Sequence, residues 1–282
     1  FSAIGEYVID QGGIVFGVEL QDDYFVRHIG VSDKEKLVKF RNSKYVQSYI
    51  GNSYKEVKEY LNSGRLVCFS GTPCQIEGLL TYLGGKPENL VLVDVVCRAV
   101  PSPGVWRKYI NMISEKLGGI KSVRFRDKTL GYQYSTMELR DKNNRIYRGG
   151  SESHPWLRMF LSGMIIRPSC TECPFRAPYR KSDFTIWDCF NIHNIDKSFN
   201  ENTGTTRMLI HTDKGKRIFE NIKDNFKYKN IDVEVAIKNV KEMVFSPEFN
   251  VKRKEFFKDY ENIPMDELIN KYFPNTFKVK LK

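Results

Sequence analysis

No apolar run in this sequence of 282 residues approaches the roughly 20 residues that a membrane-spanning helix needs. No signal peptide is visible, and no segment is of low complexity. We therefore expect a cytoplasmic protein of ordinary globular composition, with 41% apolar and 28% charged residues. The chain begins at Phe1, inside a segment with helical spacing of apolar residues, so we also expect that the native N-terminus lies further upstream.

Cysteine and histidine are both scarce. The four histidines show no ligand spacing, which disfavours a metal site built on histidine. Six cysteines in a chain of this length, without an export signal, do not form the dense pattern of a disulfide scaffold. They indicate reduced thiols, metal ligands or a catalytic cysteine.

The chain has no basic block, although its net charge is +11. Lysines and arginines are spread along the sequence and interleaved with acidic residues, which disfavours a nucleic-acid partner. Two interpretations remain: binding of anionic cofactors or of an acidic redox partner, and a basic surface that serves only solubility.

The sequence is organised around Leu66–Leu83, LVCFSGTPCQIEGLLTYL. An apolar run, a sharp turn and then apolar residues at helical spacing predict a buried strand that leads into a helix. Thr72 is the expected N-cap, Pro73 the first helical residue and Gly84-Gly85 the end of the helix. Cys74 then lies in the first helical turn, where free N–H groups favour a thiolate or a phosphate.

A second unit of the same kind follows. Leu90–Cys97 (LVLVDVVC) is continuously apolar apart from one aspartate, as in a strand buried on both faces of a parallel sheet. Ser102 and Pro103 are the expected start of a helix that ends after Leu117. Both units therefore present a cysteine at the carboxyl edge of the sheet, where open α/β sheets bind ligands.

The remaining segments predict the rest of the fold. Before the central unit we expect an N-terminal helix ending at Gly12-Gly13, a hairpin of Gly13–Leu20 and Tyr24–Val31, a helix over Asp33–Phe40 capped by Ser32, and a helix over Tyr54–Leu61. After it we expect an antiparallel insertion at about 120–150, a helix over Trp156–Ile166, strands over Ser182–Asp188 and Thr205–Thr212, and a helix over Lys214–Asn225.

These elements predict an α/β (α+β) fold: a mixed sheet with flanking helices, an antiparallel β insertion and a helical C-terminal region. We assign residues 1–230 to one catalytic domain that includes the insertion, and residues 231–282 to a helical C-terminal extension.

Cys170-Thr-Glu-Cys173-Pro174 is a CxxC pair. Such a pair is found in redox dithiols, in zinc knuckles and in iron–sulfur sites. One pair together with two isolated cysteines, Cys74 and Cys97, suits a cubane cluster held between a loop and a sheet at least as well as zinc. Four unrelated buried thiols remain the alternative. Cys68, inside a strand, and Cys189 are expected to be structural.

Six segments, in this order, resemble the beta subunit family of coenzyme F-420 hydrogenases and dehydrogenases: SKYVQS, FSGTPCQIEGLLTYL, VDVVC-x-x-VPSP, VRFRDK, RPSCTECPF and SDFTIWD. That family also includes bacterial members encoded among polysaccharide-biosynthesis genes. The resemblance implies a flavoprotein that carries FAD and a 4Fe–4S cluster and passes electrons between the cluster and a substrate on the flavin. It covers nearly the whole chain.

The resemblance also implies site residues. The cluster ligands would be Cys74, Cys97, Cys170 and Cys173. The residues that would hold FAD are Ser43, Lys44, Tyr45, Gln47, Ser48, Thr72, Gln75, Gly204, Thr205 and Thr206. No catalytic residue is assigned. Two segments depart from the family pattern: Arg98-Ala99 stands where His-Gly is usual, and Trp187–Asn191 where Gly-Asp-Phe-Trp-Gly is usual.

The sequence therefore predicts an iron–sulfur flavoprotein oxidoreductase that acts on a small substrate, for which we favour a sugar-linked metabolite. A coenzyme F-420 oxidoreductase subunit and a zinc-stabilised binding module without catalytic activity are the alternatives. A nucleophilic cysteine enzyme using Cys74 lacks a matching histidine. The expected partner is a reduced electron carrier, either ferredoxin or a deazaflavin, and the sequence leaves a homo-oligomer open.

Overall fold

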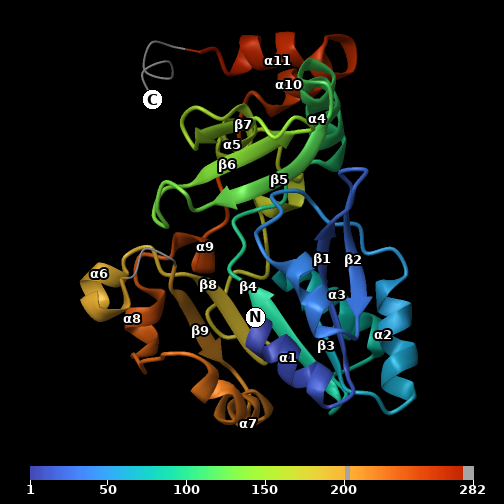
Figure 1. Ribbon diagram of the computed structural model, residues 1–282, viewed down its shortest axis with the longest axis vertical. Helices are drawn as coiled ribbons and strands as arrows, with labels where there is room; N and C mark the ends of the chain where they lie inside the picture. Colours follow the sequence, from blue (N-terminus) through green and yellow to red (C-terminus); the bar gives the residue numbers. More distant parts are fainter. Residues whose placement is uncertain (201–203, 276–282) are drawn as a thin grey trace.

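The computed structural model describes residues 1–200 and 204–275 (Figure 1). The strands of these residues form two sheets. The larger sheet has the order β2-β1-β3-β4-β8-β9, and the smaller has the order β5-β6-β7. The strands are β1 (Ile14–Leu20), β2 (Val26–Val31), β3 (Val67–Gly71), β4 (Leu90–Val95), β5 (Ile120–Asp127), β6 (Thr136–Asp141), β7 (Ile146–Gly150), β8 (Phe184–Asp188) and β9 (Thr206–Ile210).

The larger sheet is a parallel core with an antiparallel strand at each edge. Strands β1, β3, β4 and β8 are parallel, whereas β2 pairs antiparallel with β1 and β9 pairs antiparallel with β8. Alternate residues of the strands enter two separate apolar clusters, because successive side chains of a strand point to opposite faces. Helices α1 (Ser2–Asp10) and α7 (Asp213–Ile222) cover one face, and α2 (Ser53–Asn62) and α3 (Pro73–Leu83) cover the other.

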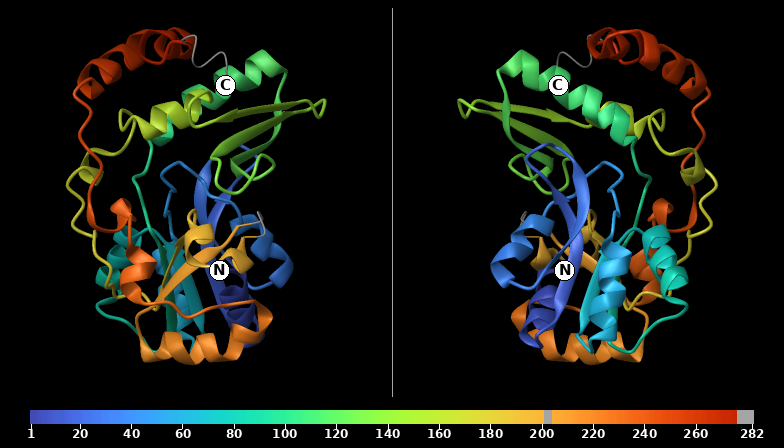
Figure 2. Two further views of the ribbon diagram at one scale, coloured as in Figure 1. Left: turned by 90° about the vertical axis from the view of Figure 1, so that its left-hand side faces the viewer. Right: turned by 90° about the vertical axis from the view of Figure 1, so that its right-hand side faces the viewer.

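The smaller sheet lies beyond one end of the larger sheet, beneath a layer of helices (Figures 1 and 2). Those helices are α4 (Pro103–Leu117), α5 (Pro155–Leu161), α10 (Arg253–Asn262) and α11 (Met265–Tyr272). One apolar cluster joins all of these elements, with Trp106 of α4 at its centre. The Trp106 ring lies 4.8 Å from that of Trp156 and 4.9 Å from that of Phe125. The insertion and the C-terminal helices therefore share a core, and the domain boundary near residue 230 stays a prediction.

The short helical segments lie in the connections. They are η1 (Lys34–Phe40), η2 (Pro168–Cys170), α6 (Ile192–Ile195), η3 (Lys197–Phe199), η4 (Lys223–Asn225), α8 (Val233–Ile237) and α9 (Lys241–Val244).

The predicted fold class is confirmed, and both strand–helix units form as expected. Thr72 and Ser102 are the N-caps, and Gly84 and Gly118 end their helices with φ of 76° and 71°. Two local predictions were wrong. The side chain of Asp33, and not that of Ser32, caps the segment that follows, which is a 3-10 helix. The helix expected to extend to Ile166 ends at Leu161, since Gly163 has a φ of 74° and Ile166 pairs with Pro101.

The topology brings distant segments to one edge of the larger sheet. The carboxyl ends of β3, β4 and β8 are followed by Cys74, Cys97 and Cys189, respectively. Because β9 runs antiparallel to β8, its first residue, Thr206, pairs with the last residue of β8, Asp188, at the same edge. Two of the predicted cluster ligands, Cys74 and Cys97, and one predicted FAD residue, Thr206, therefore lie at the same edge of the larger sheet.

Candidate functional site

The turn between β3 and α3 positions Cys74. The backbone N–H of Thr72 donates to Oε1 of Gln75 at 3.0 Å, which satisfies the start of the helix, and Pro73 occupies the first helical position. Cys74 is exposed in the first turn, and its Sγ lies 3.2 Å from Oγ1 of Thr72. The Thr72 hydroxyl also donates to Oε1 of Gln75 at 3.1 Å, so its oxygen is free to accept a hydrogen bond from the Cys74 thiol.

An antiparallel bridge brings the segments of Cys97 and Cys170 together. Pro101 pairs with Ile166, and the N–H of Arg167 donates to the carbonyl of Val100 at 2.9 Å. The bridge holds the segment after Cys97 against the segment before Cys170, and the backbone N–H of Val100 lies within hydrogen-bonding reach of the Cys170 sulfur.

Arg176 attaches the CxxC loop to the end of β4. Its guanidinium donates to the backbone carbonyls of Cys97, Arg98 and Glu242. Its Nε is buried and has no hydrogen-bond partner among residues 1–200 and 204–275. One side chain therefore holds the backbone at two candidate ligand segments and at α9, and it leaves one N–H available at the site.

The four thiols lie within range of one another's charge. Burial raises the pKa of Cys97 to about 12; Arg176 opposes this shift, whereas Cys74, Cys170 and Cys173 add to it. Burial also raises the pKa of Cys170, while a hydrogen bond from the backbone N–H of Val100 lowers it. Without a bound metal, Cys97 is a neutral thiol at neutral pH.

The structure does not bring the four sulfurs into a ligating arrangement. Within residues 1–200 and 204–275, no group of three or more His, Cys, Asp or Glu side chains is placed to hold a metal ion. The chemistry of the donors nevertheless fits a soft metal centre: four thiols on three segments, one of them accepting a backbone N–H, as sulfur ligands in iron–sulfur sites do. The assignment of the four ligands stays a prediction.

The other two cysteines lie apart from this group. Cys68 is fully buried in β3 within the apolar cluster under α1 and α7, and burial raises its pKa to about 12. Cys189 is buried after β8, with its Sγ 3.9 Å from Oδ1 of Asn191. Both positions agree with the structural roles predicted from the sequence.

A chain of hydrogen bonds extends inward from the Cys74 turn. Nε2 of Gln75 donates to Oγ of Ser48 at 2.9 Å, and Oγ of Ser48 lies 3.0 Å from Nδ1 of His28. The other ring nitrogen of His28 lies 3.1 Å from the carbonyl of Ser70, which can only accept a hydrogen bond and so assigns the N–H to Nε2. Burial lowers the pKa of His28 to about 4, so the ring is neutral. The network connects Thr72, Gln75 and Ser48, three of the residues predicted to hold FAD.

The loop after η1 holds four more of the predicted FAD residues: Ser43, Lys44, Tyr45 and Gln47. Nζ of Lys44 donates to the carbonyls of Lys39 and Arg41 at 2.9 and 2.8 Å, and burial lowers the pKa of its ammonium to about 8. The ring of Tyr45 stacks on Phe160 at 5.1 Å, so Tyr45 belongs to the core. Ser43 hydrogen-bonds to Tyr45. Lys44 thus organises its own loop.

A cleft of about 450 Å³ borders this loop. Ser43 and Lys44 line it, and Tyr24 and Phe125 provide aromatic walls. This volume falls in the range of small-molecule sites, about 300–1,000 Å³, and can accept part of a dinucleotide. Further lining residues are Leu20, Gln21, Asp22, Lys39, Arg41, Asn42, Ile120, Lys121, Ser122 and Val123.

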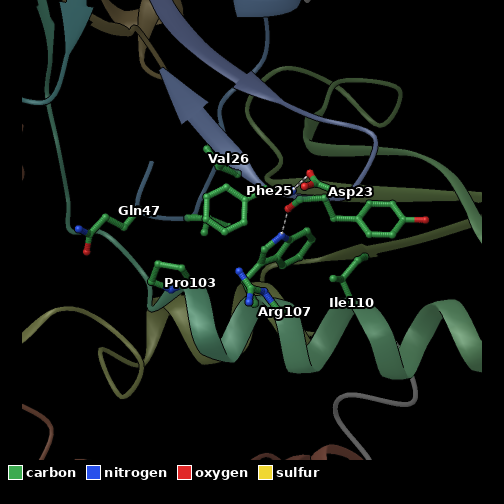
Figure 3. A pocket seen from close by; sticks show the side chains of 10 residues that line it. Asp23, Phe25, Val26, Gln47, Pro103, Arg107 and Ile110 are labelled. Carbon is green, nitrogen blue, oxygen red and sulfur yellow. Dashed lines mark hydrogen bonds between the residues drawn. The ribbon is translucent and has the colours of Figure 1, made fainter. Parts of the chain in front are cut away.

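Gln47 lies at a different and much smaller pocket, shown in Figure 3. This pocket has a volume of about 20 Å³, which suffices for one water molecule and not for a flavin ring. Its wall includes Trp106, whose Nε1 donates to the carbonyl of Tyr24 at 2.8 Å. The backbone N–H of Gln47 donates to the carbonyl of Pro101, which connects the loop to the segment after Cys97.

The predicted segment Gly204, Thr205 and Thr206 lies against the turn between β5 and β6. The hydroxyl of Tyr132 donates to the carbonyl of Thr205 at 2.6 Å. Gly204 has a φ of 108°, and a Cβ there would come within 2.7 Å of the Tyr132 ring, so only glycine fits. The segment is thereby fixed beside Asp188, which Tyr132 also contacts at 3.2 Å.

Arg126 is a residue to which sequence reasoning gave no role. Its guanidinium lies 4.9 Å from the ring centre of Phe190, and its Nε lies 3.6 Å from Oδ2 of Asp188. Its backbone exchanges two hydrogen bonds with the side chain of Asn42. Arg126 therefore connects the insertion, the loop after η1 and the end of β8. The motif VRFRDK contains it, but nothing in that pattern tells which of its two arginines is buried.

The structure accounts for one departure from the family pattern. Arg98 pairs with Glu242 at 3.2 Å and donates to the carbonyl of Leu161 at 3.2 Å. It therefore connects the end of β4 to α9 and α5. In the second departure, Nε1 of Trp187 is buried and finds no hydrogen-bond partner in the part of the chain that the structure describes.

Comparison with known proteins agrees with this architecture. A family model that describes the C terminus of the beta subunit of coenzyme F420 hydrogenase/dehydrogenase matches residues 64–236. Among solved structures, a chain of the xenon-derivatised F420-reducing [NiFe] hydrogenase complex from Methanosarcina barkeri is similar, with a TM-score of 0.54 and 14% identity. The match covers 98% of this chain and 86% of that chain. A search of the curated proteins found no match. No described helix is both long enough and apolar enough to cross a membrane.

Proposed function

The chain belongs to the coenzyme F420 hydrogenase/dehydrogenase beta subunit family, and we propose that it is an oxidoreductase subunit that carries FAD and one 4Fe–4S cluster. One observation carries the proposal: Arg176 of the CxxC loop donates to the backbone carbonyl of Cys97 at the carboxyl edge of the sheet, and the charges of Cys74, Cys170 and Cys173 act on the Cys97 thiol. Thiols that serve only packing have no reason to gather from three segments.

In this proposal the chain's own residues hold and orient the redox centre. Cys74, Cys97, Cys170 and Cys173 bind iron as thiolates, which requires the buried thiol of Cys97 to lose its proton. The N–H of Val100 and the guanidinium of Arg176 supply positive charge beside those sulfurs. When bound, the two cofactors couple one-electron transfer to two-electron chemistry on a substrate.

The FAD would lie in the 450 Å³ cleft and extend along the sheet edge. Ser43 and the loop of Lys44 support one end, and the network of Gln75 and Ser48 supplies hydrogen-bonding groups next to the Cys74 turn. The segment Gly204–Thr206 borders the opposite side of the edge. Tyr45 and Gln47 would support the FAD site indirectly. The ring of Tyr45 packs on Phe160, and the backbone of Gln47 bonds to Pro101, so neither residue is placed to contact the cofactor directly.

For the substrate we favour a small sugar-linked metabolite, reduced with electrons from ferredoxin or a deazaflavin. Coenzyme F420 is the alternative substrate. Arg98 does not decide between them, because its guanidinium pairs with Glu242. An assay that follows the oxidation of reduced F420 separates the two: activity at a rate comparable to that of family enzymes would favour the deazaflavin.

A zinc-stabilised binding module is the second candidate, because four thiols also suit tetrahedral zinc. Anaerobic purification distinguishes the two. The proposal expects a brown protein with about four iron atoms per chain and a flavin that is released on denaturation. A colourless protein with one zinc per chain and no flavin would establish the binding module instead.

A further inference from the structure

An exposed apolar patch borders the CxxC loop. It consists of Leu161, Val244, Phe245, Phe249 and Val251, and we call it the Phe245 patch. Three of these side chains are strongly exposed: Phe245 at 68%, Phe249 at 57% and Val251 at 84%. Two phenylalanines and a valine exposed to water within seven residues of the chain are unfavourable for an isolated protein, and such exposed apolar side chains mark interaction sites.

Hydrogen bonds hold the segments of the patch together. The amide of Asn250 donates to the carbonyl of Ser162 at 2.8 Å, next to Leu161. Oγ of Ser246 accepts the backbone N–H of Cys173 at 3.0 Å, directly beside Phe245. Figure 2 shows the segment after α9 rising along one side of the molecule towards α10. The patch therefore adjoins the CxxC loop. A protein bound at Phe245 would lie beside Ser246, which contacts Cys173 directly.

The surroundings of the patch are basic. Residues 238–254 contain five cationic side chains (Lys238, Lys241, Lys252, Arg253 and Lys254) and two acidic ones (Glu242 and Glu248). Glu242 is neutralised by Arg98 at 3.2 Å. Four of these cations, Lys238, Lys241, Lys252 and Lys254, are exposed and enter no ion pair that the described residues form. The whole chain is also positively charged, with a net charge of +11. An acidic partner is thus favoured over a second copy of this basic chain.

We propose that the Phe245 patch is the docking surface for a small acidic iron–sulfur electron-carrier protein. Interfaces of this kind are small and transient, and complementary charges around the contact accelerate encounter. The proposal rests on the proposed function, because it assigns the entry point for electrons to the cluster of the four cysteines. One electron moves: the carrier's cluster is oxidised, the cluster of this chain is reduced, and no bond is made or broken.

The test measures binding separately from electron transfer. An acidic bacterial 2[4Fe–4S] ferredoxin is titrated into the full chain by anaerobic calorimetry at low salt. We expect that the double variant Phe245→Asp/Phe249→Asp binds at least tenfold more weakly than the wild type. Ile146→Asp, on an exposed position of β7 outside the patch, should bind within twofold of the wild type. Both substitutions are on exposed side chains, and circular dichroism verifies that the variants fold.

Charge is tested by a second variant, Lys241→Glu/Lys252→Glu. It should weaken binding about tenfold and flatten the dependence of the affinity on salt. In stopped-flow bleaching, reduced ferredoxin should reduce the double phenylalanine variant at least tenfold more slowly, whereas dithionite should reduce both proteins equally fast, since it needs no docking surface.

The outcomes separate the two hypotheses. Equal binding of ferredoxin by wild type and the double phenylalanine variant, or no binding to a brown, flavin-containing wild type, overturns the docking surface and leaves the proposed function intact. Self-association that the phenylalanine substitutions abolish overturns it as well, because a second copy is then the occupant. A colourless protein refutes the proposed function, and with it the electron entry point, whatever its affinity for ferredoxin.

Discussion

The guanidinium of Arg176 donates a hydrogen bond to the backbone carbonyl of Cys97. Arg176 follows Cys173 by three residues, so the loop that contains the CxxC pair is held against the segment of an isolated cysteine 79 positions away. Two further hydrogen bonds, to the carbonyls of Arg98 and Glu242, extend this contact to α9. One arginine thereby joins three segments that carry or border the candidate metal ligands.

Replacement of Arg176 by methionine should loosen this junction. The change removes three hydrogen bonds from a charged donor, and we expect the free energy of unfolding to fall by about 3 kcal/mol. Iron content per chain should fall with it, because the cysteine segments lose their common anchor. Urea unfolding and iron analysis measure the two effects.

The matched control is Arg217→Met, since Arg217 is 66% exposed and pairs only with an exposed glutamate. That change should alter stability by less than about 0.5 kcal/mol. Equal stability and iron content in the two variants would show that Arg176 is not an anchor.

Replacement of Cys173 by serine should remove the visible absorption of the iron–sulfur cluster, because such clusters are held by cysteine thiolates and a hydroxyl is a poor substitute. The control is Cys189→Ala, which removes a buried sulfur that we place outside the ligand set. It should keep its iron. If the absorption survives in Cys173→Ser and disappears in Cys189→Ala, the ligand set is wrong.

Asp183 should be a main contributor to stability. Its carboxylate is fully buried, and it accepts hydrogen bonds from Nζ of Lys86 at 2.8 Å, the N–H of Leu92 at 2.8 Å and Oγ1 of Thr212 at 2.5 Å. Asp183→Ala leaves the buried N–H of Leu92 and the hydroxyl of Thr212 without their acceptor and removes the carboxylate that pairs with Lys86, and we expect a loss of about 3–5 kcal/mol in the free energy of unfolding.

Chemical denaturation measures this loss. Asp10→Ala is the control, because the pair of Asp10 with Lys34 is exposed and such pairs contribute at most about 1 kcal/mol. A similar, small loss in both variants would contradict the role of Asp183.

Stability should fall as the pH is lowered from 7 to 5. Burial lowers the pKa of His28 to about 4, from 6.5 in the unfolded chain. Between these values the unfolded state binds a proton that the folded state does not, so the stabilisation present above pH 6.5 is lost as the pH falls towards 4. From the two pKa values we expect His28 alone to lower the free energy of unfolding by roughly 2 kcal/mol at pH 5.

His28→Gln keeps a polar group beside Ser48 but does not titrate, so the loss between pH 7 and pH 5 should be smaller in this variant. His154, whose pKa burial also lowers to about 4, remains in the variant and accounts for the slope that is left. Urea unfolding of both proteins at the two pH values is the measurement. An unchanged slope would mean that His28 does not stay neutral in the folded state.

The sequence alone determined the strand–helix units and the positions of the cysteines within them. A capping residue followed by proline, Thr72-Pro73 and Ser102-Pro103, is a local signal for the start of a helix. Both helices begin at the predicted residues. The continuous apolar run of β4 likewise indicated a strand covered on both faces, and its residues Leu90–Val93 are all buried. These features depend on contacts between near neighbours, which a sequence records directly.

Only the tertiary structure decided which of these residues meet. Three contacts connect segments far apart in the chain: the bridge between Pro101 and Ile166, the hydrogen bonds of Arg176, and the hydrogen bonds of Arg126 with Asn42. The structure also showed that Lys44 is satisfied by carbonyls of its own loop and that Tyr45 packs in the core, which no pattern of residue types reveals. Side-chain partners of this kind depend on burial and on the register between segments, and neither follows from local propensity.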